Sequence, residues 1–163
     1  MNVKTLALIL AVAILAVSVT VHPQWIEIGI SKNCNLQSRL IYPFFHASFI
    51  HAFVNVWCLL GIVFLYDISF WRLLTAYIVA IFVPETLLSD IPTVGLSCVC
   101  YTLLGSLIFE VKRKLYFQFS MAVYIAVGFL FPAINASIHV YGYLAGLLVG
   151  LLNAPISCFR LKK

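Results

Sequence analysis

Long apolar runs alternate with short polar stretches along most of the chain. We expect membrane-spanning helices at six of these runs: residues 5–21, 44–66, 73–89, 96–111, 116–133 and 136–157. A helix that crosses the hydrocarbon core of a bilayer needs roughly 20 apolar residues. Because the fourth run is shorter than that, we expect a polar segment to begin inside the membrane there.

The first run also fits a signal peptide, because a single lysine precedes an apolar stretch. The run is long for the apolar region of a signal peptide, and no convincing A-x-A cleavage site follows it. We therefore expect an uncleaved first helix. Its connection to the second span, from Val21 to Pro43, contains Trp25 and Tyr42, which suit a membrane interface.

The composition agrees with this pattern. Hydrophobic residues make up 64% of the chain and charged residues 9%, whereas soluble domains average about 45–50% apolar and about 25% charged residues. A single core in a chain of 163 residues cannot hide so much apolar surface from water. We expect one all-α domain over residues 1–163, an integral, multi-pass membrane protein whose solvent is the lipid bilayer.

The formal net charge of +5 would suit nucleic acid, but its distribution indicates membrane orientation instead. In the six-span topology, eight of the ten basic residues lie on the side of the N-terminus: Lys4, Arg72, Lys112, Arg113, Lys114, Arg160, Lys162 and Lys163. Lys32 and Arg39 lie on the other side. Because basic residues concentrate in cytoplasmic loops, we expect both termini in the cytoplasm, a cell inner membrane location and no nucleic-acid partner.

The cysteines suggest packing rather than chemistry. They are Cys34, Cys58, Cys98, Cys100 and Cys158. No C-x-x-C pair is present, so neither a zinc site nor a thioredoxin-like site is indicated. Cys98 and Cys100 would point to nearly opposite helix faces and suit small apolar positions. We expect no metal and no cofactor.

Polar side chains inside apolar spans are costly, and here several of them fall at one depth. His46, His51 and Asn55 belong to the second expected span, Ser97 to the fourth and His139 to the sixth. In the six-span topology, all five lie in the outer halves of their spans. His51 and Asn55 are four residues apart and share one helix face. Three separate segments therefore deliver polar groups to one candidate site.

Glycines provide a way to bring two of these segments together. The sixth span carries them at every fourth position: Gly142, Gly146 and Gly150. Such G-x-x-x-G ridges let membrane helices approach closely. In the fourth span, Gly95 precedes Ser97, and Tyr101 and Gly105 continue the face of Ser97. Packing the ridge against this face would bring His139 to Ser97.

This set of residue types fits nucleophilic catalysis. A serine hydroxyl is a weak nucleophile until a base takes its proton, and imidazole titrates near neutrality. We expect Ser97 to be the nucleophile and His139 its base, with Tyr101 stacked on the histidine ring. His51, Asn55 and the backbone N–H of Ser97 are the expected donors to the oxyanion. The acidic residues lie in loops or at helix ends, which predicts a dyad without a third member: Glu27, Asp67, Glu85, Asp90 and Glu110.

Each feature alone has a plainer interpretation. A serine in a membrane helix usually bonds its own backbone four residues earlier. Histidine and asparagine can bond a neighbouring helix, and glycine ridges are common packing devices. The shared depth of a nucleophile, a base and two donors favours the catalytic interpretation.

In these residues the sequence resembles the rhomboid family of intramembrane serine proteases. That family pairs G-x-S-G-x-x-Y with a later histidine leading a G-x-x-x-G helix, after an earlier H-x-x-x-x-H-x-x-x-N. Here GLSCVCY supplies Gly95, Ser97 and Tyr101, HVYGYLAG supplies His139, Gly142 and Gly146, and HASFIHAFVN supplies His46, His51 and Asn55. Arg39 and Asp67 also look familial, and the resemblance runs from Arg39 to the C-terminus.

The resemblance implies a bundle of six transmembrane helices with a short fourth helix. It further implies that the protein is a hydrolase cleaving transmembrane segments of other proteins within the bilayer. Substrates would approach sideways, with the fifth span and the outer cap loop as a gate. The expected partners are therefore transmembrane protein substrates, and no cofactor is implied.

The sequence departs from the family at two points. Cys98 replaces the glycine that follows the serine, and its side chain could crowd the oxyanion pocket. The tryptophan–arginine motif of the first loop is not plainly present, although Ser38–Arg39 stands nearby; Trp71–Arg72 is expected on the cytoplasmic side. An alternative is therefore a rhomboid-like protein that binds membrane clients without cutting them. A small transporter would need charges deep in the spans, which the sequence lacks.

Overall fold

In the computed structural model, residues 2–21 and 23–153 are described. They form the following α-helices: α1 (Val3–Thr20), α2 (Trp25–Ile28), α3 (Leu36–Ile41), α4 (Phe49–Leu65), α5 (Phe70–Ile81), α6 (Ser97–Ser106), α7 (Lys114–Gly128) and α8 (Ala136–Asn153). Two 3-10 helices are present as well, η1 (Tyr42–Phe44) and η2 (Glu85–Leu87). Within this part of the chain, the β-pairing is one isolated bridge between Ile30 and Thr93. The prediction of an all-helical fold is confirmed.

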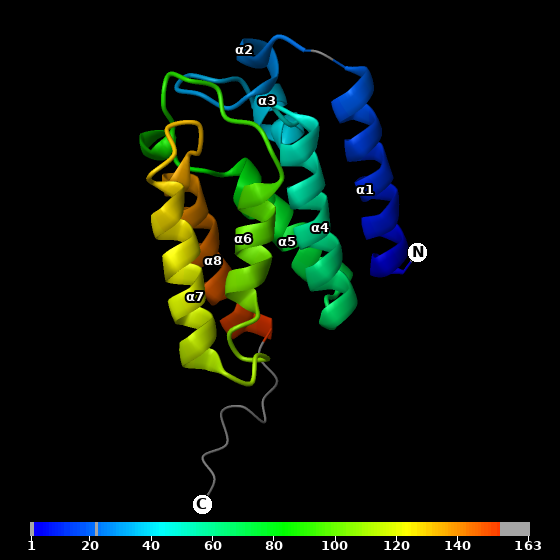
Figure 1. The fold of residues 1–163 in the computed structure, drawn as a ribbon, viewed down its shortest axis with the longest axis vertical. Coiled ribbons are helices and arrows are strands. Elements are labelled where there is room, and N and C mark those ends of the chain that lie inside the picture. The colour runs from blue at the N-terminus through cyan, green and yellow to red at the C-terminus, as the bar shows by residue number, and fades with distance from the viewer. Residues whose placement is uncertain (1, 22, 154–163) are drawn as a thin grey trace, which may run out of the picture.

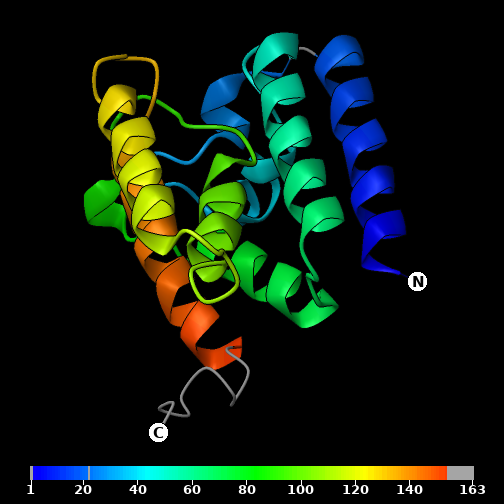
Figure 2. The ribbon, with the colours of Figure 1, turned by 60° about the horizontal axis from the view of Figure 1, so that its bottom comes forward.

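The six longer helices run side by side and alternate in direction (Figure 1, Figure 2). The start of α1 and the end of α8 consequently lie at the same end of the bundle (Figure 1). The short helix α6 occupies the middle, where it packs most extensively on α8 and also contacts α4 and α5. Seven of its ten residues are buried. The helix with the serine is therefore the central element of the fold.

Helix length alone identifies fewer than six spans. Among the described residues, α1 is long and apolar enough to cross a membrane. A second span would qualify if Leu36–Phe44 and Phe49–Leu65, bent by 82° relative to each other, were counted together. The other apolar helices, α5, α6 and Ala136–Leu152 of α8, have 10–17 residues each. The prediction that the fourth run forms a short helix agrees with α6.

The predicted start of the second span and the predicted end of the third span were wrong. The second was predicted from residue 44, but α4 begins at Phe49, where the hydroxyl of Ser48 accepts a hydrogen bond from the N–H of His51 at 3.2 Å. His46 therefore lies in an extended segment before the helix. The third was predicted to reach residue 89, but α5 ends at Ile81. Pro84 follows closely, and proline lacks the N–H that a continuing helix needs.

The remaining spans also end at different residues. The fourth and fifth runs were predicted to reach residues 111 and 133, but α6 ends at Ser106 and α7 at Gly128. The sixth was predicted to reach residue 157, and its last four residues lie outside the described part of the chain. Apolar character continues past these helix ends, which is why composition alone overestimates their length.

The seam between α6 and α8 depends on the predicted glycine ridge. A Cβ atom at Gly142 would lie 2.9 Å from the carbonyl oxygen of Cys98, and one at Gly150 would lie 2.6 Å from that of Ser106. A Cβ at Gly146 would collide with the carbonyl of Thr102. These carbonyls are spaced one helical turn apart, so the ridge follows the α6 backbone directly. Only a helix without side chains on this face can approach so closely.

Arg72 has a structural role that the sequence did not reveal. It was expected among the cytoplasmic basic residues, but its side chain is only 3% exposed. Its Nε donates to the hydroxyl of Ser106 at 2.7 Å, and its two terminal nitrogens bind the carbonyl of Ser106 and the carboxylate of Glu110. The start of α5 is thereby fastened to the end of α6.

We predict that Gly146→Ala destabilises the protein by about 1–3 kcal/mol, because the added methyl group must push α8 away from the α6 backbone. Gly61→Ala is the matched control, since a Cβ atom there meets nothing within 4 Å. That control should be neutral or gain up to about 1 kcal/mol from helix propensity. Thermal unfolding in detergent micelles would measure both. Equal stability of the two variants would contradict a tight seam.

Candidate active site

Ser97 and His139 meet at the N-terminal ends of α6 and α8. Ser97 is the first residue of α6, and His139 lies in the first turn of α8. The Nε2 atom of His139 is 2.9 Å from the Oγ atom of Ser97, and both side chains are partly buried. If the imidazole is neutral with its proton on Nδ1, Nε2 accepts the hydroxyl proton of Ser97. A serine and a base are thus within hydrogen-bonding distance.

Tyr101 supports the imidazole ring from below. It lies one turn after Ser97 on α6, and its ring stacks on that of His139 with the centroids 4.4 Å apart and the planes 19° apart. Stacking of this kind limits rotation of the imidazole and keeps Nε2 aimed at the serine. In the described part of the chain, no carboxylate makes a hydrogen bond or ion pair with His139.

The turn that leads into Ser97 is held by the segment before α4. The N–H of Gly95 donates to the carbonyl of Tyr42 at 3.0 Å. The N–H of Leu96 donates to Nε2 of His46 at 3.2 Å, so the buried histidine acts as an acceptor for the main chain. His46 was expected on the second helix beside the oxyanion donors. The structure instead places it before that helix, where it supports the loop.

Gly95 is required at this turn for two reasons. Its φ of +124° is in a region that residues with side chains rarely adopt. A Cβ atom there would also lie 2.9 Å from Cε1 of His51. The imidazole of His51 therefore covers the turn, and its ring also meets the edge of His46 with the centroids 4.9 Å apart.

Backbone donors are available where α6 begins. The N–H of Cys100 donates to the carbonyl of Leu96 at 3.1 Å, which is the first bond of the helical series. The N–H groups before it, beginning with that of Ser97, belong to the first turn, whose donors lack helical acceptors. In the described residues, no main-chain bond outside the helices uses the Ser97 N–H. This donor is free to bind an anionic oxygen beside Oγ.

Asn55 lies one turn deeper than His51. Its side chain is buried, and its Nδ2 donates to the carbonyl of His51 at 2.9 Å. An amide nitrogen carries two hydrogens, so one remains for another acceptor. Its own carbonyl accepts a long bond from the thiol of Cys100 at 3.6 Å, which joins α4 to α6. The structure thus brings His51 close to the turn at Ser97 and holds Asn55 behind it.

The cysteines occupy packing positions. Cys98 is buried with its Sγ atom 3.2 Å from the place where a Cβ atom of Gly142 would stand, so the thiol fills the seam between α6 and α8. Cys58 and Cys100 lie on the facing helices α4 and α6, and Cys34 is half-buried in the first connection. Cys158 lies outside the described residues.

Comparison with known proteins gives one decisive result. The family model described as Rhomboid domain matches residues 33–159. The chain belongs to the rhomboid family. Neither the curated proteins nor the solved structures gave a match.

The rhomboid match covers α3 to α8 and therefore every residue of the candidate site. It also includes Arg39, which the sequence marked as familial. The Nη1 atom of Arg39 donates to the carbonyls of Ile81 and Val83 at 3.3 and 2.7 Å. This arginine satisfies the open end of α5, and so joins the first connection to the third helix of the bundle.

Two groups that support the site were not predicted from the sequence. One is the backbone carbonyl of Tyr42; the residue was predicted at the membrane interface, but no side-chain pattern indicates that its carbonyl accepts a hydrogen bond. Asn135 precedes an apolar run and accepts a hydrogen bond from the N–H of Ile138 at 3.4 Å. An asparagine at the start of a helix is a recognised N-cap signal, and it would have drawn attention to this position.

We predict that His46→Ala destabilises the protein by about 1–3 kcal/mol, because the buried N–H of Leu96 loses its acceptor. His46→Gln should recover part of this loss, since the side-chain oxygen can accept the same bond. Thermal unfolding of both variants would measure the difference. Equal losses in both would show that the acceptor is not what the histidine supplies.

Proposed function

We propose that this rhomboid is a serine endopeptidase that cleaves transmembrane segments of other membrane proteins, with Ser97 as nucleophile and His139 as its base. The observation that carries the proposal is the 2.9 Å distance between Nε2 and Oγ. Membership of the rhomboid family supports intramembrane proteolysis as the reaction class. No metal or cofactor takes part in the proposed reaction.

The reaction would proceed through an acyl-enzyme. His139 takes the hydroxyl proton of Ser97 as Oγ attacks the carbonyl carbon of the scissile peptide bond. The oxyanion of the tetrahedral intermediate accepts the N–H of Ser97 and is assisted by His51 and Asn55. The imidazolium then protonates the leaving amine, and the C–N bond breaks. Water, deprotonated by the same histidine, then attacks the acyl carbon; the C–Oγ bond breaks, and the imidazolium returns the proton to Oγ of Ser97.

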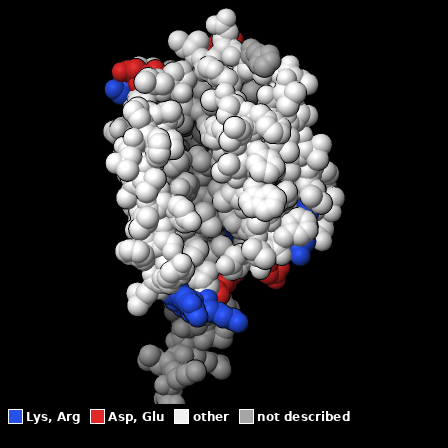
Figure 3. All heavy atoms as spheres, viewed as in Figure 1, with Lys and Arg blue, Asp and Glu red and all other residues white. Residues whose placement is uncertain are grey.

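The membrane setting is the second part of the proposal. Large apolar side chains on the outer surface are strongly exposed, including Val12 at 68%, Trp57 at 70% and Leu115 at 88%. Soluble monomers rarely expose contiguous apolar surface on this scale. On the face seen in Figure 3, charged side chains gather toward the top and the lower part of the molecule, with a broad uncharged band between them. We propose that the six longer helices all lie in the bilayer, α5 to α7 included.

Orientation follows from the same arrangement. In Figure 1 the start of α1 lies in the lower half of the bundle, toward the end that carries the turn between α6 and α7. Lys4 and the run Lys112, Arg113 and Lys114 are therefore nearer that end, whereas Lys32 pairs with Asp90 at 3.8 Å in the connections toward the opposite end. We propose that both termini are cytoplasmic and that the protein resides in the cell inner membrane.

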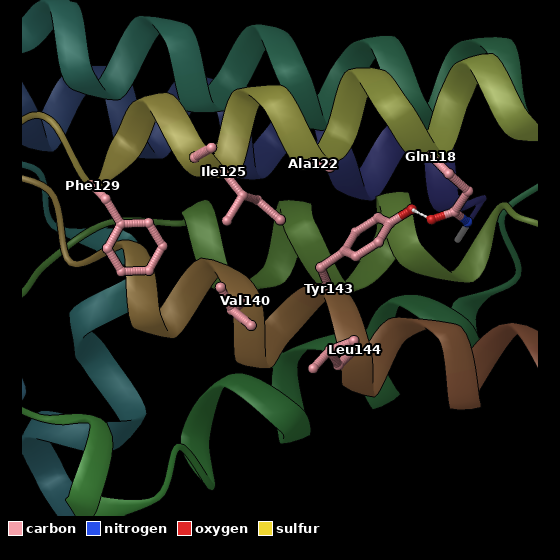
Figure 4. A pocket seen from close by; sticks show the side chains of 8 residues that line it. Gln118, Ala122, Ile125, Phe129, Val140, Tyr143 and Leu144 are labelled. Carbon is pink, nitrogen blue, oxygen red and sulfur yellow. Dashed lines mark hydrogen bonds between the residues drawn. The ribbon is translucent and has the colours of Figure 1, made fainter.

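The helix α7 is the proposed gate for substrates. It buries only Met121, Ile125 and Gly128, and its contacts are chiefly with α8. A groove of about 360 Å³ separates the two helices, and one hydrogen bond of 2.8 Å from Tyr143 to Gln118 crosses it (Figure 4). A helix so lightly attached can move aside at low cost. A substrate helix would then reach the dyad from the lipid.

The best argument for the alternative, a client-binding protein without activity, was Cys98. The position of its thiol in the seam between α6 and α8 supports the catalytic proposal. A fluorophosphonate probe separates the two functions, because such a probe labels only an activated serine.

We predict that Ser97→Ala and His139→Ala each abolish fluorophosphonate labelling and cleavage of a transmembrane substrate. The double variant should lose no more than either single variant, because the two groups act as a unit. Ser120→Ala is the matched control, since this serine on α7 only bonds the carbonyl of Tyr116. Labelling of Ser97→Ala at the parent level would contradict the proposed nucleophile.

We also predict opposite accessibility for two engineered thiols in a background without other cysteines. Lys32→Cys, at a position 51% exposed, should react with an impermeant maleimide in intact cells. Lys112→Cys should react only after the cytoplasm is opened. The reverse result would overturn both the topology and the depth assigned to the dyad.

A further inference from the structure

Thr93 and Asn135 occupy matching places in the two segments that lead to the dyad. Thr93 lies four residues before Ser97, and Asn135 lies four residues before His139. The Nδ2 atom of Asn135 donates to the hydroxyl of Thr93 at 3.4 Å and to the carbonyl of Leu87 at 3.3 Å. One side chain therefore connects the loop before α8 to the loop before α6.

Both residues are themselves fixed. The main chain of Thr93 pairs with that of Ile30 through two bonds of 2.9 Å, which tie it to the first connection. The Oδ1 atom of Asn135 accepts the N–H of Ile138 and so caps the helix that carries His139. Because the amide uses its oxygen on α8 and its nitrogen on the other loop, it cannot shift without breaking one set of bonds.

The glycine seam holds His139 from one side only. Its first close contact, between Gly142 and the carbonyl of Cys98, lies below the histidine, and the later contacts run toward the other end of the bundle. Above the histidine, the side-chain hydrogen bonds between the two loops are, among the described residues, those of Asn135. The end of α8 that carries the base is thus held below by backbone contact. Above, the buried side chains of Ala136 and Ile138 pack against the bundle, and the amide of Asn135 adds hydrogen bonds to the facing loop.

We propose that Asn135, together with Thr93, is a positioning residue that keeps Nε2 of His139 within reach of Oγ of Ser97. This inference rests on the proposed protease function. Displacing a catalytic group by about 1 Å can cost on the order of 100-fold in rate, so partial release of this end of α8 should lower turnover about tenfold. The effect should fall on kcat and not on KM, because the amide contacts the protein and not the substrate.

The experiment uses the full chain reconstituted in lipid vesicles with a transmembrane substrate. Asn135→Ser retains a good N-cap but is too short to reach Thr93. It should lower kcat and the rate of Ser97 labelling about tenfold with KM unchanged. Thr93→Val, which removes the hydroxyl, should lower kcat by less than Asn135→Ser does. Thr93→Ser, which keeps the hydroxyl, should have the parent kcat. Ser89→Ala is the control, since that hydroxyl bonds only within its own loop, to the carbonyl of Ile91.

Two outcomes would overturn the positioning role. If kcat of Asn135→Ser equals that of the parent, Asn135 acts only as a helix cap. If KM rises while kcat is unchanged, Asn135 contacts the substrate. Absence of Ser97 labelling in the parent would instead contradict the proposed function, and the positioning role of Asn135 with it. Melting temperatures of Asn135→Ser, Thr93→Val and their double variant would then still show, by non-additivity, whether the two side chains are coupled.

Discussion

The close contact between α6 and α8 is the constraint on which the rest of the structure depends. Three glycines on α8 lie against successive turns of the α6 backbone, so the helices touch without intervening side chains. That approach sets Ser97 beside His139 and makes α6 the buried centre of the bundle. Of the other elements, α4 and α5 also contact α6, and residues of η1 and α5 satisfy polar groups that the short helix leaves open.

A short helix inside a membrane has unpaired main-chain groups at both ends, and lipid cannot satisfy them. The main-chain groups at the two ends of α6 have different partners. At the far end, Arg72 binds the carbonyl of Ser106. At the near end, Tyr42 and His46 take the N–H groups just before the helix and leave that of Ser97 uncommitted. The bundle thus satisfies the last turn of α6 and leaves the N–H of Ser97 without a main-chain partner.

Much of this arrangement could be predicted from the sequence, because it depends on residues that recur at helical spacing within short segments. Glycine spacing on α8 and the serine, tyrosine and histidine positions follow from helical periodicity. The place of His46 could not be predicted, since the apolar run continues through the bend before Phe49 and only the Ser48 cap marks the true start. The partners of Arg72 could not be predicted for a related reason. From the sequence alone, an arginine near a helix end is interpreted as a solvent-exposed cation in a loop. Its partners Ser106 and Glu110 come from another part of the chain, so the sequence does not indicate that it is buried.

The Arg72 cluster has a consequence for how the protein assembles. An unpaired arginine is costly to keep in a lipid environment, yet its partners lie on α6 and just after it, and they are made later than α5 during synthesis. If α5 lies in the bilayer as proposed, the guanidinium must stay in contact with water until they arrive. We therefore expect α5 to settle to its final depth only once α6 is present, so that these two helices enter the bilayer as a hairpin. The order of insertion would then deliver the serine-bearing helix directly into its place.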